Sequence, residues 1–283
     1  MKLINTIDQM RAFRTATRHS GKRLSLVPTM GALHEGHLSL VRAAREKSDV
    51  VAASIFVNPT QFGPNEDFAR YPRNLENDSK MLAREHVDVI FAPSVNDMYP
   101  AGAVTWVSVE GMSDRLCGKS RPGHFRGVTT VVAKLFHIIE PDVAFFGQKD
   151  AAQVAIIRRM VRDLNMPVQI EVGAIVREPD GLALSSRNAY LGPEERKSAL
   201  VLHRSLQCAQ NLFDSGERES AKLIAASKGE FAKEPAVCLD YFEIVDPDSL
   251  EAMSSISKRA LIAVAAHVGN TRLIDNILVD PQR

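Results

Sequence analysis

Strand-length apolar runs alternate with helix-length segments through the first two-thirds of the chain, and this alternation limits the possible folds most strongly. Val50–Val57 is an almost unbroken apolar run rich in β-branched residues. Runs of this kind are typical of parallel strands that are covered on both faces. Between Leu24 and Val176, helical patterns separate this run from the other strand-like runs. The alternation predicts an α/β fold with a doubly wound parallel sheet.

The expected elements fall into two groups along the chain. The strands of the parallel sheet are predicted at Leu24–Thr29, Val50–Val57, Val87–Ala92, Val143–Phe146 and Gln169–Val176. Its helices are predicted at Gly36–Lys47, Asn74–His86, Val128–Ile139 and Ala151–Leu164. A second group follows, with helices at Pro193–Asp214 and Glu219–Lys233 and strands at Cys238–Val245, Ala260–Val268 and Arg272–Val279. This order predicts a catalytic domain at 1–176 and a smaller C-terminal α+β domain at 177–283, which we expect to act as a lid.

Composition excludes several classes of protein. The 283 residues are 45% hydrophobic and 24% charged, as in ordinary globular proteins. A net charge of +1, from 35 basic and 34 acidic residues, argues against a nucleic-acid partner. The N-terminus has no apolar leader, and the longest apolar runs are shorter than the ~20 residues of a membrane span. Three widely spaced cysteines suggest reduced thiols. We therefore expect a cytoplasmic protein with no membrane partner.

The segment after the first strand has the properties of a phosphate site. Ligands of open α/β sheets bind beyond the carboxyl ends of the strands. Here a glycine turn leads directly into a helix, whose unpaired N–H groups and dipole favour anions. His34 and His37 lie three residues apart, on one helix face. The segment reads Met30-Gly31-Ala32-Leu33-His34-Glu35-Gly36-His37. The alternative is two surface histidines that cap the helix.

Polar residues also follow the second strand, where Pro59 ends the apolar run. Asn58 and Gln61 place two neutral amides in this loop. Because an amide both donates and accepts hydrogen bonds, the pair suits a substrate that carries hydroxyls beside a carboxylate. Turn chemistry alone also explains the Asn-Pro sequence.

The strand at Val143–Phe146 leads into Gly147-Gln148-Lys149-Asp150 at the start of a helix. Lys149 is expected to hold nucleotide phosphates, and Asp150 to cap the helix and contact a Mg²⁺-phosphate unit through water. Gln153, one turn later, would face the same cleft. A helix cap with a solvated lysine is the alternative.

Two further loops carry groups that suit phosphate. Leu184-Ser185-Ser186-Arg187-Asn188 combines two hydroxyls with a guanidinium, which binds phosphate oxygens in a bidentate manner. The basic loop from Arg115 to Arg126 is a candidate lid or phosphate clamp. A flexible hydrophilic loop is the alternative for the first segment, and a merely solvated basic loop is the alternative for the second.

Several common active-site motifs are missing from the sequence. It has no Walker A motif, and no G-x-G-x-x-G follows a strand. It also lacks H-E-x-x-H, a Cys/His cluster and G-x-S-x-G. A P-loop, a dinucleotide site, a protein-bound metal and a hydrolase nucleophile are therefore not expected.

These motifs resemble those of a known family. His34-x-Gly36-His37 resembles the HxGH signature of the nucleotidylyltransferase superfamily, and Ser185-Ser186-Arg187 resembles its second, KMSKS-type loop. The strings PTMGALHEGH, SIFVNPTQF, FFGQKD and GLALSSRN are similar to the pantothenate synthetase family, over essentially the whole chain. The resemblance implies a Rossmann-like domain and condensation of pantoate with β-alanine, using ATP and Mg²⁺ and releasing AMP and pyrophosphate. It also implies a homodimer built on the N-terminal domain.

Site residues are implied by matching position. The resemblance assigns catalytic roles to His34, His37, Lys149 and Arg187, with His37 as proton donor. It assigns ATP contacts to Met30 through His37, Gly147 through Asp150, Val176 and Leu184 through Arg187. Gln61 and Gln153 would hold pantoate, with Gln61 near the β-alanine entry as well. Asn58 is a further substrate-binding candidate on account of its amide. Two departures are Gln148, where many relatives have Glu, and Ala151-Ala152, where they have an aromatic residue or a second Gln.

Three other functions share parts of this pattern. A simple nucleotidylyltransferase would transfer AMP or CMP and stop there. A tRNA-charging enzyme would need an anticodon-binding domain and a basic face, which the chain lacks. A regulatory protein would bind ATP without turnover.

Overall fold

The computed structural model describes residues 1–64 and 66–282, and the chain divides into two compact units. The first unit comprises Met1–Ser113, Arg121–Gly147 and Ile156–Ala174. The second comprises Asp114–Ser120, Gln148–Ala155 and the chain from Ile175 onward. The second unit thus includes two short segments from the earlier part of the chain, which a division at 176/177 leaves out. The roles assigned to the two domains stay predictions.

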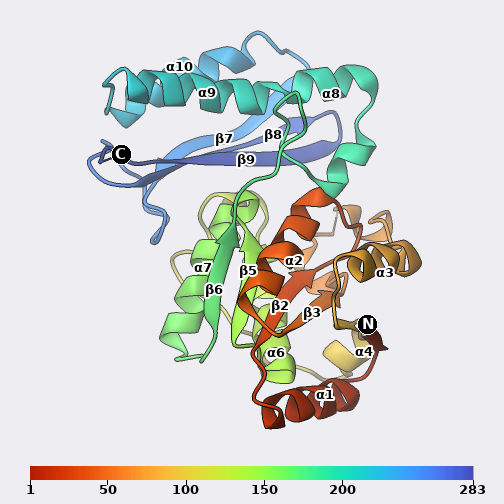
Figure 1. Cartoon of the computed structure of the whole chain (residues 1–283). Helices are drawn as coiled ribbons and strands as arrows, with labels where there is room; N and C mark the ends of the chain where they lie inside the picture. Colours follow the sequence, from red (N-terminus) through yellow and green to blue (C-terminus); the bar gives the residue numbers. More distant parts are fainter. Residues whose placement is uncertain (65, 283) are drawn as a thin grey trace. The chain divides into compact units, whose positions relative to one another are not determined.

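The first unit is built on six parallel strands in the order β1-β4-β3-β2-β5-β6 (Figure 1). The chain moves outward from β2 to β3 and β4, then returns to place β5 on the other side of β2. This reversal confirms the doubly wound sheet and puts its switch point between β2 and β5, where ligands of such sheets bind. The strands are β1 Lys2–Ile4, β2 Leu24–Thr29, β3 Val50–Ile55, β4 Val89–Phe91, β5 Val143–Gly147 and β6 Gln169–Gly173.

Helices cover this sheet because their apolar faces need burial. Side chains of α2 and α3, among them Leu40, Val41 and Leu82, pack with those of β2, β3 and β4 in one buried cluster. α1 and α6 contact each other in a second helical layer. The helices that run wholly or partly in this unit are α1 Ile7–His19, α2 Glu35–Lys47, α3 Leu75–Arg84, α4 Val95–Met98, α6 His124–Ile139 and α7 Ala151–Asp163.

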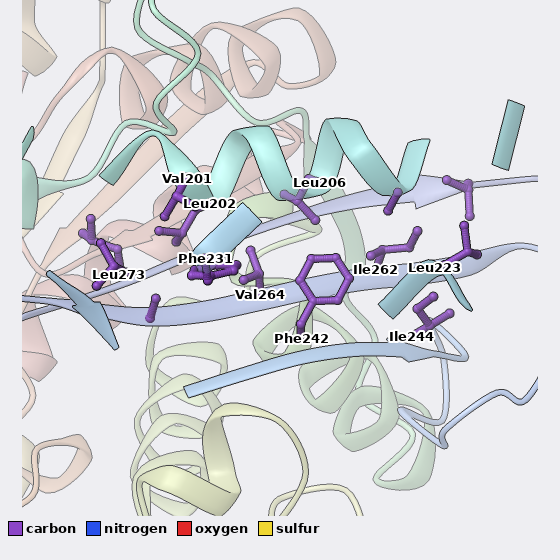
Figure 2. Close-up of a cluster of buried hydrophobic side chains, with 14 of the residues drawn as sticks. Val201, Leu202, Leu206, Leu223, Phe231, Phe242, Ile244, Ile262, Val264 and Leu273 are labelled. Atoms are coloured by element: carbon purple, nitrogen blue, oxygen red, sulfur yellow. The ribbon is translucent and has the colours of Figure 1, made fainter. Parts of the chain in front are cut away.

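The second unit packs two helices against a three-stranded antiparallel sheet. Figure 2 shows buried hydrophobic side chains of this core. Leu202 and Leu206 of α9 meet Val264 of β8 and Phe242 of β7 in the core. This arrangement confirms the smaller α+β domain. Its regular elements are α5 Cys117–Ser120, α8 Pro193–Ala199, α9 Val201–Asp214, α10 Ser220–Phe231, β7 Val237–Val245, β8 Ala260–Val268 and β9 Thr271–Val279.

The structure corrects several predicted boundaries. The strand expected to reach Val57 ends at Ile55, because its partner strand ends at Thr29, which pairs with Ile55. The strand expected to reach Val176 ends at Gly173, which pairs with Gly147. The long helix predicted at Pro193–Asp214 is divided at Leu200 into α8 and α9. β1 and α1 were not predicted. Among the described residues, no helix combines the length and the apolar character needed to cross a membrane.

Candidate active site

His34 and His37 cap the first turn of α2 reciprocally. The Gly36 N–H donates to His34 Nδ1 at 3.2 Å, and the His34 N–H donates to His37 Nδ1 at 3.3 Å. The ring centroids are 4.1 Å apart, and a Cβ on Gly36 would lie 3.0 Å from the His34 ring. A neutral imidazole that accepts at Nδ1 carries its proton on Nε2. The capping alternative is therefore observed, and it also fixes the tautomer that a proton donor needs.

Asp78 of α3 holds the turn that precedes these histidines. Its carboxylate accepts the N–H of Ala32 at 3.0 Å and that of Leu33 at 2.9 Å. Ala32 has a φ of 51° and Gly31 a φ of 79°, so the turn uses left-handed backbone at two positions. A Cβ on Gly31 would lie 2.8 Å from Asp78 Oδ2. The turn and the carboxylate therefore fit together only with glycine at position 31.

Sequence reasoning did not single out Asp78. Acidic residues in helices are usually solvated, yet this one is 1% exposed. The one available signal was its spacing, because Asp78 lies four residues before buried Leu82 and thus on the same helix face.

Asn58 is a buried anchor for the loop after β3, with 1% of its surface exposed. Its Oδ1 accepts the Thr60 N–H at 3.3 Å, and its Nδ2 donates to Gly127 O and to Gln61 Oε1, each at 3.1 Å. Gln61 Nε2 in turn donates to Met30 Sδ at 2.9 Å. Asn58 is thus engaged in the turn, and its contact with substrate stays a prediction. The structure also brings two predicted site residues, Met30 and Gln61, into contact.

The basic loop fastens the same segment. Arg121 donates to both carboxylate oxygens of Glu66, at 2.7 and 2.5 Å, and to Gln61 O at 3.2 Å. His124 contacts Gln61 O through Nδ1 at 2.8 Å and Arg121 through Nε2 at 3.1 Å. Because a guanidinium only donates, Nε2 must accept and Nδ1–H must donate. Burial raises the pKa of Glu66, but the bonds from Arg121 outweigh burial and leave that pKa below its ordinary value.

These contacts show that the basic loop from Arg115 to Arg126 is not merely solvated. The side chains of Arg121 and His124 support the main chain of Gln61, and the Arg126 guanidinium lies 4.9 Å from the centre of the Trp106 ring. In the second unit, Arg115 donates to Ser249 O at 2.7 Å. A role for this loop as a lid or phosphate clamp stays a prediction.

In the second unit, Lys149 and Ser185 line one small recess together with Asn188 and Asp275. Two of the predicted phosphate-binding residues, from separate parts of the chain, are thus brought together. Lys149 belongs to a single 3-10 turn, Gln148–Asp150, that leads into α7. Asp150 is exposed at the end of this turn.

The loop that carries Ser185, Ser186 and Arg187 is ordered by its own hydrogen bonds. Ser185 Oγ accepts the Arg187 N–H at 3.3 Å and so caps the 3-10 helix Ser186–Tyr190. The Leu184 N–H donates to Val176 O at 3.0 Å. Asn188 Nδ2 donates to Glu178 Oε1 at 3.2 Å and to Ala183 O at 3.1 Å. The alternative of a flexible hydrophilic loop does not fit this bonding.

The predicted site residues fall into one set in each unit. The first unit holds Met30 through His37, Asn58, Gln61 and Gly147, and the second holds Gln148 through Asp150, Gln153, Val176 and Leu184 through Arg187. Within residues 1–64 and 66–282, no group of three His, Cys, Asp or Glu side chains is placed to bind a metal ion.

Comparisons with known proteins place this geometry in a family. A family model described as pantoate-beta-alanine ligase matches residues 2–278. A pantothenate synthetase of Koribacter versatilis is 57% identical over 279 residues, covering 99% of this chain and 96% of that protein. One of Moorella thermoacetica is 58% identical over 280 residues, covering 99% of each.

Solved structures agree with these relatives. The crystal structure of pantothenate synthetase from Thermus thermophilus is 45% identical with a TM-score of 0.94, covering 99% of this chain and 100% of that one. That of pantoate-beta-alanine ligase from Francisella tularensis, complexed with beta-gamma ATP and beta-alanine, is 36% identical with a TM-score of 0.81, covering 98% and 97%. A match over nearly the whole chain, with relatives more than half identical, shows that this chain belongs to the pantoate-beta-alanine ligase family.

Proposed function

We propose that this protein condenses pantoate with β-alanine at the expense of ATP, through an enzyme-bound pantoyl-adenylate. The observation that carries the proposal is the His34–His37 cap, which lies after β2 beside the switch point of the sheet. Membership of the ligase family gives the overall reaction, and the complex of the Francisella tularensis relative with beta-gamma ATP and beta-alanine supports these ligands. AMP and pyrophosphate are the other products.

In the first step, a pantoate carboxylate oxygen attacks the α-phosphorus of ATP, and the bond to pyrophosphate breaks. The protein's task is to position the reactants and to stabilise negative charge. The N-terminus of α2 and the Nε2–H of His37 suit the phosphates of ATP. Lys149, Ser185, Ser186 and Arg187 supply two cations and two hydroxyls for the triphosphate.

In the second step, the β-alanine amine attacks the acyl carbon, the bond to AMP breaks and the amine loses a proton. Pantoate must stay in place until then. Gln61 and Gln153 are the amides we assign to its hydroxyls and carboxylate, and Asn58 orients the Gln61 side chain. Met30, Gly31, Ala32, Leu33, Glu35, Gly36, Gly147, Gln148, Val176 and Leu184 are assigned to ATP as main-chain or packing contacts.

Mg²⁺ is assigned to the reaction as a partner of ATP. Asp150 is exposed at the start of α7 and offers the hard carboxylate oxygens that Mg²⁺ prefers, reached through water. When bound, Mg²⁺ neutralises phosphate charge. We further propose a cytoplasmic location, because Cys117, Cys208 and Cys238 are all free thiols, as a reducing compartment keeps them.

A labelling experiment tests the intermediate. Pantoate that carries ¹⁸O in its carboxylate should pass one labelled oxygen to AMP when β-alanine is present. Without β-alanine, pantoate should still promote exchange of labelled pyrophosphate into ATP, because the first step is reversible. Label in inorganic phosphate with ADP as co-product would contradict the adenylate. Release of pyrophosphate with no response to any amine would instead indicate a simple nucleotidylyltransferase.

A further inference from the structure

Asn276 of β9 binds the turn that carries Lys149. Its Nδ2 donates to Gln148 O at 3.0 Å and to Lys149 O at 2.9 Å, across 128 and 127 residues of sequence. Its Oδ1 accepts from Gln148 Nε2 at 2.9 Å. The side chain therefore makes three of the four hydrogen bonds open to an amide. Asn276 is 3% exposed, so these bonds form where water competes little.

An amide is the side chain that this position requires. The two main-chain carbonyls need donors, and the Gln148 amide offers a donor that needs an acceptor. An aspartate of the same shape would place a carboxylate oxygen against two carbonyl oxygens and leave them without a donor. Packing alone would not distinguish the two side chains.

The preceding residue, Asp275, supports the other phosphate-binding loop. It accepts two hydrogen bonds from Arg177, at 2.6 and 2.9 Å, and its side chain is 3% exposed. Arg177 also donates to Gly181 O at 3.0 Å and pairs through its backbone with Ala183. The chain between Arg177 and Ala183 leads directly into the Ser185–Arg187 loop. Asp275 thus holds the base of that loop and lines the recess shared by Lys149 and Ser185.

Consecutive strand residues point to opposite faces of a sheet. Leu273 and Val279, an even number of positions from Asp275, belong to the buried core. Asp275 therefore lies on the core face of β9, and Asn276 lies on the other face. These two consecutive residues of the edge strand therefore contact the two segments from opposite faces of the sheet. Asn276 contacts the turn that carries Lys149, and Asp275 contacts the base of the Ser185–Arg187 loop.

We propose that Asp275 and Asn276 form a positioning pair that sets the location of Lys149 relative to the Ser185–Arg187 loop. The inference rests on the proposed role of these residues toward the ATP phosphates. Neither member of the pair is assigned a contact with substrate, and each acts through the segment that it binds. Because displacing a positioned charge by about 1 Å can cost on the order of 100-fold in rate, a small loosening of either segment should show in ATP use.

The test is the isosteric variant Asn276→Asp, studied as the full-length protein. We expect kcat/KM for ATP to fall on the order of 10- to 100-fold, with KM for pantoate changed less than about twofold. Asn276→Ser, which keeps a single donor, should give a smaller loss and serves if the aspartate variant does not fold. Asp246→Asn is the matched control, because it removes a half-buried carboxylate of the same unit that contacts Ser249 and Lys258. It should keep native kinetics.

A double-mutant cycle with Lys149→Ala separates positioning from general stability. If Asn276 acts through Lys149, the change at 276 should have little further effect on ATP turnover in the Lys149→Ala background. Fully additive losses, or equal losses for ATP and pantoate, would overturn the inference. So would native ATP kinetics in Asn276→Asp while Lys149→Ala is impaired. Native kinetics in Lys149→Ala itself would instead overturn the proposed role of Lys149, and the positioning role with it.

Discussion

His37 accepts a main-chain hydrogen bond through Nδ1, and its Nε2–H is the group we assign to the ATP phosphates. His37→Ala should cut adenylate formation on the order of 100-fold, as loss of one positioned donor does at a reacting centre. The missing cap should cost only about 1 kcal/mol of folding stability. Pyrophosphate exchange and thermal unfolding, measured on the same preparation, separate the two effects. Native exchange in a folded His37→Ala protein would remove His37 from the mechanism.

Gln153 differs from His37 in its ligand, because we assign Gln153 to pantoate and His37 to ATP. Gln153→Leu keeps the size of the side chain but leaves substrate hydroxyls or carboxylate unpaired, at a cost of about 1–3 kcal/mol. Pantoate binding should therefore weaken about 5- to 150-fold, with ATP binding nearly unchanged. Separate calorimetric titrations of the two ligands measure this difference. Equal losses for both ligands would show that Gln153 supports the helix and not the substrate.

At the scale of elements, the turn between β2 and α2 depends on Asp78 of α3. Asp78→Asn keeps the shape of the side chain but turns one acceptor oxygen into an NH₂ group that faces a main-chain N–H. We expect a loss of about 1–3 kcal/mol in the free energy of unfolding, together with reduced ATP turnover. Urea unfolding checks the first effect.

The control for Asp78 is Glu76→Gln in the same helix, because the Glu76 side chain is 81% exposed. It should leave stability within about 0.5 kcal/mol of the native value. A similar small effect for Asp78→Asn would mean that the turn holds its left-handed residues without the carboxylate.

The turn after β7 gives a pH dependence. The bond from Lys258, at 2.5 Å, and the N–H groups of Ser249 and Asp248 lower the pKa of Asp246 to about 2. The folded pKa is thus below the unfolded one, so the stabilisation is present near neutral pH and is lost as pH falls toward 2. Asp246→Asn should cost about 1–2 kcal/mol at pH 7, and the difference from native should narrow by about half by pH 3. A difference that stays constant from pH 7 to pH 3 would contradict this origin.

Elements bounded by strong apolar patterns were predictable from the sequence. The bounds of β2 and β8 agree with the predicted runs at Leu24–Thr29 and Ala260–Val268. β1 was not predicted because three residues are too few to show the hydrophobic alternation that indicates a strand. Likewise, strand ends that depend on the length of a partner, such as those at Ile55 and Gly173, are set by pairing that no local pattern reveals.

At the scale of the whole molecule, the sequence indicated which loops carry the chemistry but not what holds them. The motifs after β2, β3 and β5 could be predicted from the sequence because ligands of parallel sheets bind at the carboxyl ends of the strands. Asp78 and Asn276 were not, since each supports a loop at a distance of 45 or more residues. A polar residue reveals such a role only when the fold buries it beside its partner. The roles of the site residues themselves stay predictions.

For the whole molecule, we propose a homodimer formed through the first unit. Val104 is 83% exposed and Trp106 is 43% exposed, two positions apart in one segment. The Trp106 ring is already ordered by Tyr99, at 6.5 Å between ring centroids, and by the Arg126 guanidinium. Neighbouring exposed apolar side chains that are held in place favour burial against another protein surface.

Light scattering at micromolar concentration should therefore give about twice the 31.2 kDa of one chain. Val104→Asp should shift the protein toward the monomer, because burying an unpaired carboxylate at an interface costs several kcal/mol. Leu164→Asp is the matched control: Leu164 is 52% exposed in the same unit, and the change should leave the native mass. A native protein of single-chain mass, or a dimer that is indifferent to Val104→Asp but disrupted by Leu164→Asp, would show that this segment is not the contact between copies.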